Sequence, residues 1–108
     1  EEGKVTRFFD IHGLSDEHDF DIGVFYPSRF LKSIHLAQQL GQSLNHGALR
    51  GSSTCIFRFE DNGQETLGEF VASKLRVPSI QVEVARYIRE KPLLRNTFIE
   101  NLSELLRS

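Results

Sequence analysis

Short apolar segments alternate along the chain with longer amphipathic segments, and this order restricts the possible fold more than any other feature. Strands are predicted for four segments rich in β-branched and aromatic residues: 5–12, 20–26, 54–59 and 79–84. Helices are predicted for three segments with apolar residues at three- and four-residue spacing: 28–44, 65–75 and 92–106. The resulting order, β-β-α-β-α-β-α, is typical of an α/β layer fold.

The last predicted strand is apolar at Ile80, Val82 and Val84, as expected for a strand whose sheet is covered by helices. We therefore predict an α/β fold with a mixed, largely parallel sheet flanked by helices. The 108 residues show no internal repeat and no linker, which predicts a single α/β domain over residues 1–108. The chain contains no Met, even at position 1, so we expect it to derive from a longer polypeptide.

The composition argues against several classes of partner. The formal net charge is −2 and the pI is about 6.1, so there is no global basic field to attract nucleic acid. No apolar run approaches the roughly 20 residues of a membrane span, and no segment resembles a signal peptide. The single cysteine, Cys55, lies in a predicted strand and is expected to be a buried thiol. These features favour a cytoplasmic protein without a membrane partner.

The first candidate for chemistry is His12, at the predicted end of the first strand in Phe8-Phe9-Asp10-Ile11-His12-Gly13. A neutral imidazole is a good zinc ligand, and Asp10 lies on the same strand face, where a carboxylate can orient a neighbouring ligand. The alternative is a histidine that binds only backbone or water, because a zinc site needs about three protein ligands. The residues from Gly13 to Asp19 are predicted to form a polar loop.

Glu83 is the second candidate, because it is a lone carboxylate inside the apolar strand 79–84. A carboxylate in a covered sheet needs a partner or has a raised pKa. It could act as a general base that activates water beside a metal ion. The alternative is a structural glutamate that forms an ion pair with Arg86 or Arg89.

Two arginines are candidates for binding a substrate carboxylate. Arg58 lies on the third predicted strand and Arg86 follows the fourth. A guanidinium group can bind a carboxylate through two parallel hydrogen bonds. The alternative for both is a surface arginine whose aliphatic part packs on the protein.

The ordered set of segments resembles zinc carboxypeptidases and N-formylglutamate amidohydrolases. Phe8 to Gly13 is similar to the strand that ends in the second zinc-binding histidine of these enzymes. Asp19 to Gly23 is similar to the element that follows this strand. The segment Ile80 to Arg86 looks like the later strand that carries their general-base glutamate. The resemblance covers roughly residues 5 to 90 and implies a phosphorylase/hydrolase-like α/β fold.

By this resemblance, His12 would be a zinc ligand, Glu83 the acid/base residue, Asp10 an orienting carboxylate and Arg58 a substrate-facing group. Both families take two further zinc ligands from an upstream motif such as His-x-x-Glu, and no histidine precedes His12 in this chain. We therefore expect the C-terminal part of a larger hydrolase domain, with weak or no zinc binding by this chain alone. The missing ligands belong to an N-terminal half that was cut away, are supplied by another chain, or have been lost from the site.

The leading hypothesis is a zinc-dependent amidohydrolase or carboxypeptidase-like enzyme acting on a small amide or peptide. The alternative is a non-catalytic ligand-binding or interaction domain that uses the loop from His12 to Asp19 and the arginines as its surface. A missing N-terminal half would leave apolar surface exposed, so self-association through a sheet edge or helix face is a further prediction.

Overall fold

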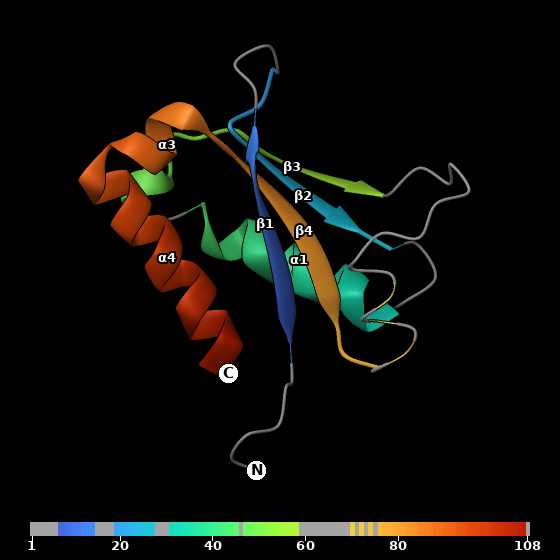
Figure 1. The fold of residues 1–108 in the computed structure, drawn as a ribbon. Helices are drawn as coiled ribbons and strands as arrows, with labels where there is room; N and C mark the ends of the chain where they lie inside the picture. The colour runs from blue at the N-terminus through green and yellow to red at the C-terminus, as the bar shows by residue number, and fades with distance from the viewer. Residues whose placement is uncertain are drawn as a thin grey trace.

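A four-stranded sheet forms the centre of the computed structural model, which describes residues 7–14, 19–27, 31–45, 47–58, 70, 72, 74 and 76–107. The strands are β1 (Phe8–Leu14), β2 (Ile22–Tyr26), β3 (Thr54–Arg58) and β4 (Ser79–Ala85). The helical elements are α1 (Leu31–Ser43), the 3₁₀ turn η1 (Gly47–Leu49), α3 (Arg86–Glu90) and α4 (Pro92–Arg107). Figure 1 shows β1 at one edge of the sheet and β3 at the other.

The strand order is β1-β4-β2-β3, which places the last strand of the chain inside the sheet. β1 pairs in parallel with β4, and β2 pairs in parallel with β3. The two parallel pairs meet through an antiparallel contact between β4 and β2. This confirms the predicted α/β fold with a mixed, largely parallel sheet.

One face of the sheet, here called the helix face, carries the apolar core. Its strand residues pack against α1, α3 and α4 in a single cluster of buried side chains: Ile22, Val24, Leu36, Ala37, Leu40, Leu44, Leu49, Ile80, Val82, Val84, Ile88 and Phe98. α1 and α4 also touch each other, since Ser43 Oγ donates a hydrogen bond of 2.6 Å to Asn101 Oδ1. Burial of these side chains is the main force holding helices and sheet together.

One local prediction is wrong, and one element was not predicted. β1 does not end at His12, because Gly13 and Leu14 continue the strand opposite Val84 and Ala85. The short helix α3 was not predicted; it buries Ile88 in the core, and its Arg86 and Glu90 side chains form an i,i+4 ion pair.

The other predicted segments can be compared only where residues are described. Of the predicted helix 65–75, Phe70, Ala72 and Lys74 are described and are helical, while its remaining residues lie outside the described part. Residues 5–6, 28–30 and 59 of the predicted elements also lie outside it, as does most of the predicted loop after Leu14. Among the described helices, none is long and apolar enough to cross a bilayer.

Candidate functional site

The two leading candidates, His12 and Glu83, are direct neighbours across the β1–β4 pair. Adjacent strands lie about 4.8 Å apart, and residues paired in register point to the same face of a sheet. The same row continues to Gly23 of β2 and Cys55 of β3. We call the face that carries this row the site face; it is the opposite of the helix face.

Asp10 occupies the next row of the site face and contacts His12 directly. Its Oδ2 lies 3.0 Å from His12 Nε2, with His12 exposed and Asp10 half-buried. This contact holds the imidazole by one nitrogen and leaves Nδ1 for another partner. Such a carboxylate contact to the second nitrogen is common for histidines that bind metal ions.

Glu83 does not form the ion pair that the structural alternative requires. Its half-buried carboxylate receives one long hydrogen bond, 3.5 Å from Gln81 Nε2. Arg86 pairs instead with Glu90 at 3.2 Å, and Arg89 Nε donates to the Val84 carbonyl at 3.0 Å. A carboxylate without a strong fixed partner can accept a proton from a substrate or from water.

The two predicted substrate-binding arginines lie in different places. Arg86 begins α3 directly after β4, so it is close in sequence to Glu83, but its guanidinium group is exposed and pairs with Glu90. Arg58 is the last residue of β3, at the far edge of the sheet. It pairs with Tyr26 and therefore belongs to the helix face, so the structure does not bring Arg58 together with His12 and Glu83.

An aromatic cluster on the site face was missed by the sequence analysis. Phe57 lies between Phe20 and Phe25, with ring centroids 5.1 Å and 5.0 Å apart respectively, and the second pair is stacked. Phe25 is paired with Gln81, so the cluster borders the row that contains Glu83. Each strand by itself shows only one of these rings, Phe25 in β2 and Phe57 in β3. The pairing of the two strands, which the sequence pattern does not give, brings the rings together.

Gly23 leaves room for these rings beside Glu83. A Cβ atom added at Gly23 would lie 2.7 Å from Phe20 Cε2 and 2.9 Å from Phe25 Cε1, both below normal contact distance. We expect Gly23→Ala to lower the free energy of unfolding by about 1–3 kcal/mol, because the rings must move. Gly51→Ala is the control, since no atom lies within 4 Å of its added Cβ. Urea denaturation measures both, and equal stabilities of the two variants would contradict the prediction.

Tyr87 of α3 is a further titratable group, two residues after the end of β4. Its hydroxyl lies 3.4 Å from Ser52 Oγ, and burial raises the pKa of Tyr87, with Asp21 raising it further. The phenol therefore stays protonated at neutral pH. Because it faces Ser52 and Asp21, it is not part of the row that contains His12 and Glu83.

The donor atoms on the site face fit part of a zinc site. An imidazole nitrogen and carboxylates are suitable zinc ligands, and a site needs about three of them from protein. Within the described residues, however, no three His, Cys, Asp or Glu side chains form a group that could hold a metal ion. Further ligands are therefore needed for tight binding.

No family model and no curated protein sequence matches the chain. The fold does resemble a solved structure, that of the N-acetylmuramoyl-L-alanine amidase AmiC2 of Nostoc punctiforme, with a TM-score of 0.64. The two share 18% sequence identity over 94% of this chain and 56% of that chain. This chain thus spans little more than half the length of the structure that it resembles. At this identity the similarity establishes the fold.

Proposed function

We propose that this chain is the C-terminal portion of a zinc-dependent amidohydrolase or carboxypeptidase-like enzyme, which cleaves an amide bond with an activated water molecule. The observation that carries the proposal is the pairing of His12 with Glu83 in one row of the site face. These residues come from strands separated by most of the chain, and their residue types are those of a metal ligand and a general base.

The fold supports the same class of reaction. The solved structure that the chain resembles is named as an amidase, an enzyme that hydrolyses an amide. Because a fold does not determine an activity, the support from the fold is weaker than the support from the site.

His12 would bind zinc through Nδ1, because Nε2 already contacts Asp10. Asp10 would hold the imidazole ring in place and keep its electron density available to the metal ion. When bound, zinc would polarise the scissile carbonyl group and acidify the attacking water. The remaining zinc ligands would come from outside the described residues, as the resemblance to the zinc hydrolases implies.

Glu83 would be the acid/base residue. Its carboxylate lies next to His12, is partly shielded from water and is bound only weakly by Gln81. It can therefore take a proton from the attacking water and pass it to the leaving amine. Arg86, which follows Glu83 by three residues, is our candidate for binding a carboxylate on an acidic amino-acid or peptide substrate; it would have to leave Glu90 to do so.

The zinc content of the complete gene product tests this proposal. We expect the purified protein to bind zinc, and His12→Ala to lower its zinc affinity at least about 10- to 100-fold. His35→Ala is the matched control, because His35 is an exposed residue of α1, whose buried side chains pack against the helix face. Titration calorimetry and metal analysis measure both variants. Equal zinc affinity in the two variants would exclude His12 as a ligand.

A non-catalytic binding domain is the second candidate function. It would use the exposed guanidinium group of Arg86 and the surface around His12 to bind a ligand without cleaving it. If the complete gene product binds a carboxylate ligand equally well before and after treatment with a chelator, and shows no amide hydrolysis, this function replaces the enzymatic one.

A further inference from the structure

The outer edge of β1 offers backbone hydrogen-bonding groups that no described strand uses. β1 is an edge strand, paired only with β4 within the described part of the chain. Phe8 N donates a hydrogen bond of 2.9 Å to the Pro78 carbonyl, so Phe8 directs its backbone groups toward β4. Because this direction alternates along a strand, the N–H and C=O groups of Phe9, Ile11 and Gly13 point outward. An open edge of this kind is a template for another strand.

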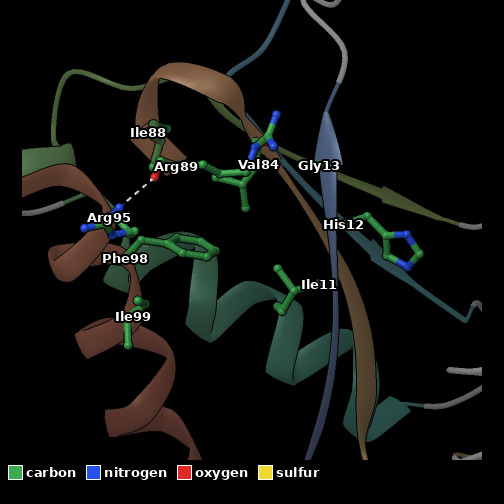
Figure 2. A pocket seen from close by; sticks show the side chains of 9 residues that line it. All are labelled: Ile11, His12, Gly13, Val84, Ile88, Arg89, Arg95, Phe98 and Ile99. Atoms are coloured by element: carbon green, nitrogen blue, oxygen red, sulfur yellow. Dashed lines mark hydrogen bonds between the residues drawn. The ribbon is translucent and has the colours of Figure 1, made fainter. Parts of the chain in front are cut away.

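Apolar surface accompanies this open edge. Ile11 is 46% exposed and lines a pocket of about 290 Å³ between β1 and α4, together with Phe98 and Ile99. In Figure 2, Ile11 points to the α4 side of β1 and His12 points to the other side. Ile99 is also half exposed. The edge that would accept a strand thus lies beside apolar side chains that are exposed to solvent.

We propose that β1 pairs antiparallel with β1 of a second copy of this chain, with Ile11 on the two-fold axis, and that Asp10 of the second copy thereby enters the candidate site of the first. In this register Ile11 lies opposite Ile11, and Phe9 lies opposite Gly13. All of these residues direct their backbone groups outward, so each would exchange hydrogen bonds with its opposite residue. The interface is isologous, as in most homodimers.

The side chains of β1 favour a second copy as the occupant. With Ile11 on the axis, Asp10 lies directly opposite His12 of the second copy, in a non-hydrogen-bonded pair with Cα atoms about 4.5 Å apart. Because His12 Nε2 contacts Asp10 of its own chain, Asp10 of the second copy would meet the Nδ1 side of the ring in the zinc-free protein, where an acid and an imidazole are complementary partners.

The neighbouring registers are less favourable. Moving the axis to Asp10 would set two carboxylates directly opposite each other, which is destabilising. Moving the axis to His12 would set two imidazoles opposite each other and remove the Asp10–His12 pairs. The charges along β1 therefore select the register centred on Ile11.

Pairing in this register would extend the site across the dimer. One continuous row would contain Glu83, His12 and Asp10 of the second copy, all on the site face. Each copy would gain a carboxylate beside His12, where the described residues of one copy form no three-ligand group. This inference concerns assembly and does not depend on the proposed catalytic roles.

A disulfide cross-link at Ile11 tests both the dimer and its register. In the 108-residue chain with Cys55→Ser, Ile11→Cys would place one thiol on each side of the two-fold axis, with Cα atoms about 5.5 Å apart, which is within the range of disulfides. We expect nearly complete covalent dimer after mild oxidation. Phe9→Cys is the matched control: its two copies would lie about 14 Å apart, four residues along the strand, and should remain monomeric on a non-reducing gel. No cross-link at Ile11, or equal cross-linking of both variants, would overturn the proposal.

The mass in solution provides the second test and needs no cysteine. Sedimentation velocity should show a dimer for the unchanged chain and a monomer for Ile11→Pro, because proline removes an outward N–H that the β1–β4 ladder does not use. Circular dichroism checks that the variant keeps its fold. A monomeric unchanged chain would overturn the proposal. Both readouts are independent of activity, so they separate this inference from the proposed function.

Discussion

Glu83→Gln should reduce amide hydrolysis by the complete gene product by about 10²- to 10⁴-fold, the usual contribution of a general acid/base residue. Glutamine keeps the shape of glutamate and can retain the contact with Gln81, but its amide cannot take a proton from water at neutral pH. Because Glu83 is not proposed as a zinc ligand, zinc content should stay unchanged. Steady-state kinetics on acyl amino-acid amides, with metal analysis of the same sample, measure both quantities.

Glu100→Gln is the control for this prediction. Glu100 is an exposed glutamate of α4, and it lies outside the row that contains His12. We expect kcat to be unchanged in this variant. Activity retained in Glu83→Gln would remove Glu83 from the reaction. Loss of zinc together with activity would instead make Glu83 a ligand.

Leu40→Ala should lower the free energy of unfolding by about 2–5 kcal/mol. Leu40 is fully buried on α1, in the cluster that joins this helix to the sheet. Truncation removes buried apolar atoms and leaves a cavity that the surrounding strands cannot fill completely. Since a domain of this size is stable by only about 5–15 kcal/mol, the variant should unfold at a much lower urea concentration.

Gln38→Ala is the matched control on the same helix. Gln38 is exposed, so its truncation should change the free energy of unfolding by no more than about 0.5 kcal/mol. Urea denaturation followed by circular dichroism compares the two variants. A similar midpoint for both would show that α1 does not depend on its packing against the sheet.

Much of the local structure was predictable because it is set by the spacing of apolar residues. The strands β2, β3 and β4 and the helices α1 and α4 agree with their predicted segments to within a few residues. The boundary of β1 was misjudged because Gly13 is an unfavourable strand residue by itself, and its pairing with Val84 supplies the missing stabilisation. α3 is too short to show a helical period in the sequence.

The candidate site was predictable only in parts. Alternation along a strand places Asp10 with His12 on one face, and Gln81 with Glu83 on one face, whatever the sheet around them. The same alternation could not decide whether Arg58 shares that face, because its strand is separated from β1 by two others. The structure assigns Arg58 to the helix face through its pairing with Tyr26.

The α/β fold, the two polar pairs on otherwise apolar strands, and residue types suited to metal binding and to acid/base chemistry all follow from the amino-acid sequence. The entry of β4 between β1 and β2, in a register that sets both His12 and Gly23 beside Glu83, is seen only in the folded chain. Strand order and register depend on long-range burial of Ile80, Val82 and Val84 under the helices, which no local pattern encodes. A shift of one residue would turn Glu83 into that core, and burial of an unpaired carboxylate excludes it.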